Sequence, residues 1–246
     1  LTCGTTACPS DIDSCNGWNP TDIFVRTYEK SKEFTKSYGF RMKTDSENKL
    51  TRNTGFYERT SKLTRNFVDA RGFWLPNDYT KHGVINEYNA CREDAVLIDL
   101  SSLRKFEILG PDAEELMNYT LTRNVKKLSV GQIVYSAMCY ENGTMFDDGT
   151  LLKLSDHGFR WICGDEYGGE WLKEQAKKKN YKVHIKNSTD QINNLSLQGP
   201  KSRKILEKII FTPPTQPSIS ELEWFRFTIC RLEELNGIPL IVSRTG

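Results

Sequence analysis

The clearest alternation of apolar and polar residues lies between residues 132 and 154. Residues 132–140 and 150–154 are both rich in strand-forming side chains, and Asn142-Gly143 lies between them. Asn-Gly between two such runs favours a tight turn, because Gly adopts positive φ without strain. The pattern therefore predicts an antiparallel hairpin in this part of the chain.

The rest of the chain alternates segments of helical and strand periodicity. The predicted helices are residues 20–36, 57–65, 83–92 and 169–179. The predicted strands are residues 96–100, 105–109, 160–163 and 182–185, followed by a second hairpin of residues 226–232 and 238–242. Short connections between strands, with helices interspersed, favour an α+β fold of mainly antiparallel sheets with flanking helices.

Two segments, residues 105–113 and 194–206, share one pattern of strand, Gly-Pro and helix. Proline is favoured in the first turn of a helix, where its missing N–H is not needed. We interpret the two segments as related units in adjacent subdomains.

The charge of the chain is nearly balanced, at a net +2. This balance gives no reason to expect nucleic acid or a membrane as a partner. No apolar run approaches the ~20 residues that span a bilayer, and the first residues lack the charged-then-apolar pattern of a secretory signal. We therefore expect a cytoplasmic protein, or one of the mitochondrial matrix if the source is eukaryotic.

The chain has seven cysteines, and four of them lie in apolar contexts that are typical of buried, reduced thiols. These four are Cys91, Cys139, Cys163 and Cys230. The other three, Cys3, Cys8 and Cys15, lie in a polar leader without Cys-x-x-Cys or a nearby fourth ligand. Three cysteines could ligate zinc, but a structural zinc site takes a fourth Cys or His, so we predict no metal site.

Two adjacent carboxylates, Asp147 and Asp148, follow the Asn142-Gly143 turn. Aspartate is depleted in strands, and successive strand residues point to opposite faces of a sheet. One carboxylate could therefore face a pocket while the other faces solvent, or both could belong to a solvated turn. The residues alone leave these alternatives open.

Several segments in a fixed order carry a resemblance to a known family: residues 87–101, 106–113, 131–135, the Asp147-Asp148 pair and residues 195–200. In this order they resemble the tetrahydrofolate-binding aminomethyltransferase superfamily, typified by the glycine cleavage T-protein. Residues 22–26, 55–59 and 72–76 resemble the lead-in to the folate domain of dimethylglycine and sarcosine dehydrogenases.

The resemblance implies a domain organisation. We expect residues 1–73 to form an irregular and helical lead-in region and residues 74–246 to form the folate-binding domain, incomplete at its C-terminus. We read the chain as a fragment and expect it to be inactive alone. FAD, if the protein uses it, is expected in a flavin domain or subunit outside this chain.

The resemblance also implies roles for two residues. Asp148 occupies the place of the family's catalytic, folate-contacting carboxylate, while Asp147 is less important because relatives also carry Ser or Asn there. Tyr135, thirteen residues before Asp148, occupies the place of a pterin-contacting aromatic residue, although a core Tyr is the alternative. The chain departs from the family at Leu152, where a Tyr is common, and in lacking Asn within residues 162–165.

Three functions remain open at this point. The first is a folate-dependent transferase that accepts a one-carbon unit from a small methylated amine such as dimethylglycine or sarcosine. The second is a tetrahydrofolate-dependent demethylase of another methyl donor, such as a sulfonium compound. The third is a non-catalytic folate-binding protein.

Overall fold

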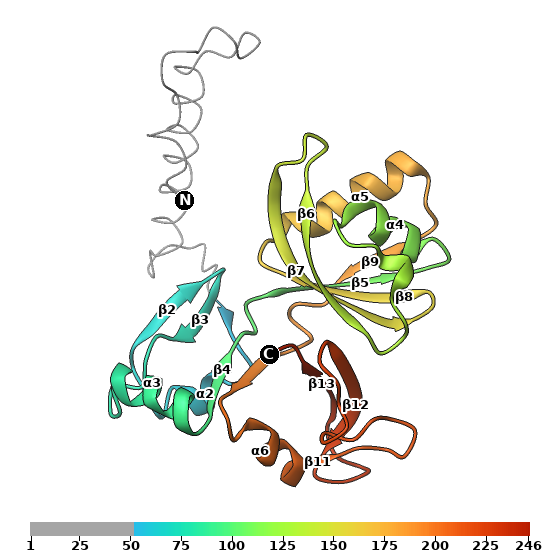
Figure 1. Cartoon of the computed structure of the whole chain (residues 1–246). Coiled ribbons are helices and arrows are strands. Elements are labelled where there is room, and N and C mark those ends of the chain that lie inside the picture. Colours follow the sequence, from blue (N-terminus) through green and yellow to red (C-terminus); the bar gives the residue numbers. More distant parts are fainter. Residues whose placement is uncertain (1–51) are drawn as a thin grey trace, which may run out of the picture. The chain divides into compact units, whose positions relative to one another are not determined.

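The computed structural model describes residues 52–246, and its compact unit runs from Asn53 to Gly246 (Figure 1). The predicted helix over residues 20–36 and the cysteines Cys3, Cys8 and Cys15 lie outside the described residues. The β2–β3 hairpin crosses the boundary between residues 73 and 74 that the resemblance implies. That division of the chain stays a prediction.

The fold combines short helices with mainly antiparallel strands, as predicted. The helices are α2 (Tyr57–Thr60), α3 (Val84–Glu93), α4 (Ala113–Thr120), the 3-10 helix η2 (Val125–Lys127), α5 (Tyr167–Lys179) and α6 (Ser202–Ile209). The strands are β1 (Arg52–Asn53), β2 (Phe67–Ala70), β3 (Phe73–Pro76), β4 (Val96–Asp99), β5 (Arg104–Leu109), β6 (Ile133–Cys139), β7 (Met145–Ser155), β8 (Gly158–Cys163), β9 (His184–Asn187), β10 (Leu195–Gln198), β11 (Ile210–Phe211), β12 (Arg226–Leu232) and β13 (Pro239–Arg244).

Within residues 52–246 the strands form four sheets, with orders β1-β3-β2, β10-β4, β11-β12-β13 and β6-β7-β8-β5-β9. Every pairing in the five-stranded sheet is antiparallel. The predicted α+β class is therefore confirmed. Strand β9 begins two residues later than the sequence pattern predicts, since the backbone N–H of Lys182 is bonded instead to the Asp112 carboxylate, at 2.7 Å.

One face of the five-stranded sheet carries the main core, which α4 and α5 cover (Figure 1). In α4 the buried residues recur at the spacing of one helix face: Ala113, Leu116, Met117 and Thr120. Truncation of a fully buried Leu such as Leu116 to Ala typically costs ~2–5 kcal/mol of stability. The packing of this face therefore holds the sheet and the two helices together.

The opposite face of the same sheet has a smaller core at one end. There Ile133 and Leu152 are buried with Phe227 of β12. The backbone joins the two sheets as well, since Ile133 donates a hydrogen bond to the carbonyl of Phe225, at 2.9 Å. The rest of this face, beyond Ile133 and Leu152, carries Tyr135 and Asp148.

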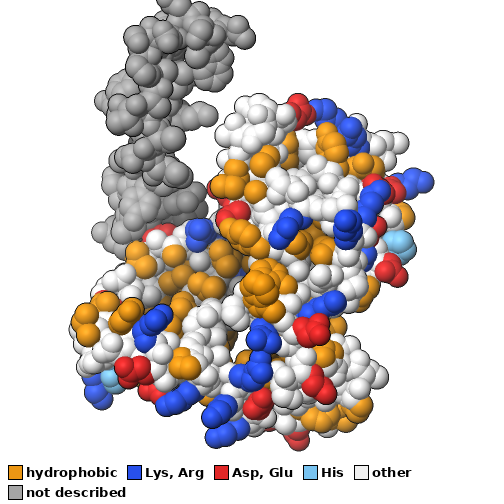
Figure 2. All heavy atoms as spheres, in the orientation of Figure 1, with side chains coloured by type: hydrophobic (Ala, Val, Ile, Leu, Met, Phe, Trp, Pro, Cys, Tyr) orange, Lys and Arg blue, Asp and Glu red, His pale blue; other side chains and the backbone are white. Residues whose placement is uncertain are grey.

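Helix α3 leaves its apolar side chains in solvent. Val84, Ile85 and Tyr88 are between 60% and 73% exposed, and α3 has no buried residue. Figure 2 shows hydrophobic side chains at the surface over the part of the molecule that holds β2, β3 and α3.

Candidate functional site

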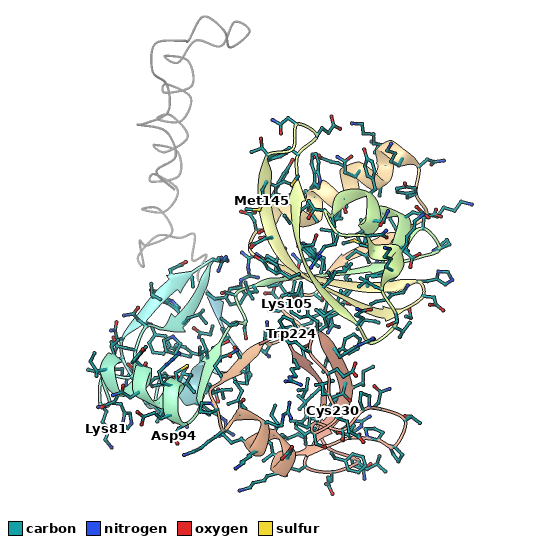
Figure 3. All side chains as sticks on the ribbon, in the orientation of Figure 1. Lys81, Asp94, Lys105, Met145, Trp224 and Cys230 are labelled. Carbon is teal, nitrogen blue, oxygen red and sulfur yellow. The ribbon has the colours of Figure 1, made fainter. Side chains whose placement is uncertain are left out.

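The predicted hairpin is present and consists of β6 and β7. Gly143 has a φ of 83° in the connecting turn, and its N–H donates to the Tyr140 carbonyl, at 2.9 Å. The turn is therefore one that Gly adopts without strain, as the Asn-Gly signal predicts. Met145, at the start of β7 (Figure 3), is exposed, and the two aspartates follow it within the strand.

A β-bulge in this hairpin decides which face each aspartate occupies. Cys139 pairs with Met145 and Met138 with Asp147, so Phe146 is one extra residue on β7. Such a bulge shifts the alternation of faces by one residue. As a result, Asp147 lies buried on the side of the main core, and Asp148 is exposed on the opposite side.

Asp148 meets Tyr135 on the exposed side of the sheet. Asp148 pairs with Ala137 and Tyr135 with Thr150, which places the two side chains diagonally on one face. The Tyr135 hydroxyl donates a hydrogen bond to Asp148 Oδ2, and the Tyr135 side chain is half-exposed. The hydrogen bond to Asp148 raises the pKa of Tyr135, with smaller contributions from burial and from the charges of Asp148 and Asp147. The phenol thus keeps its proton and orients the carboxylate.

Asp147 makes a different set of contacts. Its Oδ1 accepts hydrogen bonds from the backbone N–H of Asp148, at 2.9 Å, and of Gly164, at 3.3 Å. Its Oδ2 accepts one from the backbone N–H of Asp165, at 3.1 Å. Burial, together with the Asp147 carboxylate, raises the pKa of the Cys163 thiol far above its ordinary value. Cys163 is therefore an inert thiol and no nucleophile.

Comparison with known proteins identifies the family. Residues 56–246 match the sequence model of the GCVT N-terminal domain. The chain belongs to this family. The whole chain is 50% identical, over 246 residues, to the trimethylamine-oxide aldolase of Ruegeria pomeroyi and covers 31% of that protein. It is also 33% identical over 205 residues to the aminomethyltransferase of Symbiobacterium thermophilum, covering 81% of the chain and 52% of that enzyme.

A solved structure has the same fold. The crystal structure of glycine cleavage system aminomethyltransferase T from Bartonella henselae aligns with a TM-score of 0.64 at 23% identity. The alignment covers 79% of this chain and 50% of that protein. The GCVT domain described here thus spans about half, or less, of the length of these relatives.

Two parts of the GCVT domain differ from the family pattern that the resemblance implies: Leu152 and residues 162–165. Leu152, where the resemblance implies a Tyr, is 3% exposed and packs with Ile133 and Phe227. Its side chain is covered and offers no hydroxyl to a ligand. Gly164 and Asp165 lie in the segment where the resemblance implies an Asn, and both donate backbone N–H groups to Asp147.

Two basic residues near this site were not singled out from the sequence. Arg71 forms a two-residue turn with Gly72, and both have positive φ, at 55° and 80°. Its Nη2 lies 3.5 Å from the position that a Cβ on Gly164 would take. Of the two residues only Gly72 signals a turn in the sequence, because Gly adopts positive φ without strain.

Lys105, on β5 (Figure 3), is the second residue that was missed. Lys105 pairs with Ile162 of β8, and Ile162 pairs with Thr150 of β7. Thr150 in turn pairs with Tyr135 of β6, so all four residues share one face of the sheet. Lys105 Nζ donates to the Ser101 carbonyl, at 2.8 Å, and the Lys105 side chain is fully buried. Burial lowers its pKa to about 8, which nearby Asp99 partly offsets.

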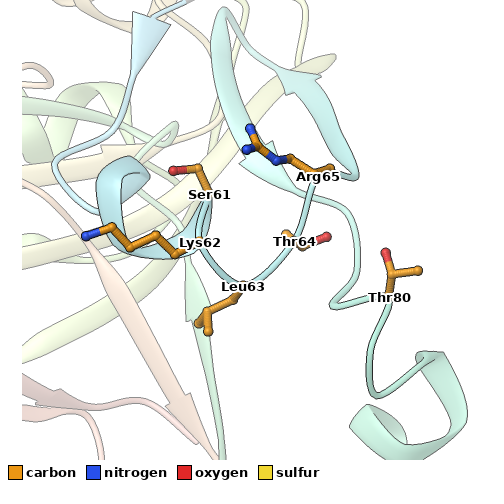
Figure 4. Close-up of a pocket in the computed structure, with 6 residues that line it drawn as sticks. All are labelled: Ser61, Lys62, Leu63, Thr64, Arg65 and Thr80. Carbon is orange, nitrogen blue, oxygen red and sulfur yellow. The ribbon is translucent and has the colours of Figure 1, made fainter.

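Other kinds of site find little support in residues 52–246. No group of three or more His, Cys, Asp or Glu side chains is placed there to hold a metal, and no helix in that range is long and apolar enough to cross a membrane. A depression of about 570 Å³ lies beside α2, lined by residues 61–65 and Thr80 (Figure 4). Its side chains spread apart and do not converge on one point. It contains neither Asp148 nor Tyr135.

Proposed function

We propose that this GCVT domain binds tetrahydrofolate and takes part in the transfer of a one-carbon unit to it. The observation that carries the proposal is the Asp148 carboxylate, held by the Tyr135 hydroxyl on an exposed sheet face. Membership of the GCVT family and the relatives named aminomethyltransferase support it.

The residues on this face fit a folate. A pterin is a flat ring that needs an apolar surface and a few polar groups at its edge. The half-exposed Tyr135 ring offers such a surface, and the partly buried Ile162 lies on the same face. Asp148 supplies the polar group. When bound, tetrahydrofolate supplies two nitrogens that take up a one-carbon unit at the oxidation level of formaldehyde and release water.

Asp148 has two ways to assist this transfer. Its carboxylate can accept the proton that a nitrogen loses as the new C–N bond forms, or it can stabilise positive charge on that nitrogen. Tyr135 occupies Oδ2 and holds the carboxylate in place, which leaves Oδ1 for the ligand. The raised pKa of Tyr135 means that this hydrogen bond persists at neutral and mildly alkaline pH.

For the donor, we propose an amine N-oxide of the trimethylamine oxide type. The support is the 50% identity over the whole chain to a trimethylamine-oxide aldolase. Trimethylamine oxide splits into dimethylamine and formaldehyde without gain or loss of electrons. Dimethylglycine or sarcosine, the donors that the sequence resemblance implies, would need a two-electron acceptor such as FAD elsewhere in the protein. With the amine oxide as donor, the protein therefore needs no electron acceptor outside this chain.

The test uses the full-length protein, with tetrahydrofolate and one donor at a time. The expected result is methylenetetrahydrofolate, together with dimethylamine, from trimethylamine oxide. Formation from dimethylglycine or sarcosine, and only with an added electron acceptor, would overturn the proposed donor but not the folate site. Failure of the full-length protein to bind tetrahydrofolate would overturn the folate site itself. That result would indicate that the domain keeps the GCVT fold for a function that does not involve folate.

A further inference from the structure

The resemblance gives Asp147 the smaller role of the two aspartates, yet its carboxylate has the larger number of contacts. It is 9% exposed and accepts three backbone hydrogen bonds, from Asp148, Gly164 and Asp165. A buried carboxylate without such donors would be costly, so these contacts are what allow it to lie there. We propose that Asp147 is a positioning residue, which fixes the backbone of Asp148 so that its carboxylate stays against Tyr135.

The place of Asp147 in the sheet explains how it does this. The ladder between β7 and β8 ends at the pair Gly149 and Cys163. Beyond this pair, the N–H groups of Gly164 and Asp165 donate to the Asp147 side chain and not to a backbone carbonyl. The carboxylate thus continues the connection between the two strands where the ladder stops. Since Asp148 lies between Gly149 and Asp147, its backbone is held on both sides.

Gly164 leaves space for the Asp147 carboxylate because it has no Cβ. A Cβ on Gly164 would lie 3.0 Å from Oδ1, and one on Gly168 would lie 3.8 Å from Oδ2. Gly168 belongs to the first turn of α5, where the helix dipole favours negative charge. Gly164 and the first turn of α5 therefore accommodate the carboxylate.

A neutral residue at this position is not equivalent. Asparagine has one acceptor oxygen and an NH₂ group that only donates. In Asp147→Asn, at least one of the three backbone N–H groups would face another donor and lose its hydrogen bond. The contacts thus predict a marked effect of this substitution, whereas the resemblance implies a small one.

The test uses the Tyr135 hydroxyl as a reporter for the position of Asp148. The hydrogen bond to Asp148 makes the largest contribution to the raised pKa of Tyr135, and the charge of Asp147 makes the smallest. The titration of Tyr135 is followed by NMR in ¹³C-tyrosine-labelled full-length protein and assigned with Tyr135→Phe. Asp148→Asn gives the full drop in the Tyr135 pKa. If Asp147 positions Asp148, Asp147→Asn should give most of that drop. An unchanged Tyr135 pKa in Asp147→Asn would overturn the proposal.

Gly164→Ala provides a second variant that keeps both charges. The added Cβ would press on Asp147 Oδ1 and should also lower the Tyr135 pKa, whereas Asp156→Asn, at an exposed position on the β7–β8 turn, should not. If either site variant fails to fold, hydrogen exchange in the wild-type protein tests the proposal. The amides of Gly164 and Asp165 should exchange slowly if they donate to Asp147, and exchange as fast as in an open loop would contradict the proposal.

The consequence for activity rests on the proposed function and is measured separately. Displacement of a reacting group by about 1 Å can lower a rate by roughly 10²-fold. Asp147→Asn should therefore lower kcat for one-carbon transfer by roughly 10- to 100-fold, with a change of less than about threefold in the dissociation constant for tetrahydrofolate. A fall in folate affinity with unchanged kcat would contradict positioning. If the wild-type protein shows no transfer at all, the proposed function fails, while the Tyr135 titration still tests the positioning role.

Discussion

The Tyr135 hydroxyl donates a hydrogen bond to the Asp148 carboxylate on the exposed face of the β6–β7 hairpin. The two residues lie thirteen positions apart in the sequence, and the hairpin brings them together as diagonal neighbours. The pair combines a carboxylate with an aromatic surface, and each part can be tested alone.

Asp148→Asn removes the negative charge and keeps the size of the side chain. If Asp148 acts as a base or stabilises a cation, transfer by the full-length protein should fall by roughly 10²–10⁴-fold. The dissociation constant for tetrahydrofolate should change far less, because the apolar contacts remain. Single-turnover rates and folate binding measured on the same preparation check both. Asp156→Asn, at an exposed position on the β7–β8 turn, is the control and should behave as wild type. A wild-type rate in Asp148→Asn would show that the Asp148 carboxylate does not assist the transfer.

Tyr135→Phe keeps the ring and removes the hydroxyl. The loss of one hydrogen bond to a carboxylate should lower kcat by about tenfold, since such a bond contributes ~1.5 kcal/mol or more when it is well formed. Folate affinity should stay within about threefold of wild type. Tyr135→Leu, which removes the ring, should weaken folate binding instead. Equal affinities in these two variants, measured by calorimetry, would show that the ring does not contact the pterin.

Lys105 makes stability depend on pH. Its pKa is lowered from 10.5 to about 8 by burial. Between these two values the unfolded chain holds the proton and the folded chain does not, so the contribution of this residue to stability rises with pH. Below about pH 8 both states are protonated, and the buried charge is a constant cost. The free energy of unfolding of wild type should therefore rise, relative to Lys105→Met, from pH 8 to pH 10. Urea denaturation at several pH values measures it, and a constant difference would contradict the lowered pKa.

Two neighbouring glycines in α5 should respond in opposite ways to alanine. A Cβ on Gly169 would lie 2.2 Å from Cε1 of the Phe106 ring, which is buried in the main core. Gly169→Ala should therefore destabilise the domain by ~1–3 kcal/mol, as overpacking does. A Cβ on Gly168 finds its nearest atom at 3.5 Å, an ordinary contact, so Gly168→Ala should leave stability equal or slightly raised. Thermal unfolding compares the two, and equal midpoints would count against the packing described.

Local sequence signals were sufficient for much of the fold. The Asn142-Gly143 turn predicted the β6–β7 hairpin because a two-residue signal between alternating runs needs no distant contact. The same holds for α5, since the helix predicted over residues 169–179 lies within the observed Tyr167–Lys179. Both features depend on neighbours within a few residues along the chain. The α+β class followed from the order of these local elements.

The faces of the two aspartates could not be assigned from the sequence in the same way. Alternation predicted that they point to opposite sides, but the bulge at Phe146 decided which of them is buried. The position of a bulge depends on the pairing register of two strands and on the packing of the extra residue. Here the Phe146 ring also packs on Tyr140 and Trp171, at centroid distances of 4.7 and 5.6 Å. Trp171 comes from α5, which lies far along the chain.

The sequence by itself determined the hairpin and the antiparallel class, because strand periodicity and turn chemistry are local. Only the tertiary structure decided that Asp147 accepts N–H groups from Gly164 and Asp165 and that Lys105 is buried beneath the same face. The Asp147 contacts join β7 to the two residues that follow β8. Their energy comes from burial and hydrogen bonding that exist only after the sheet has formed.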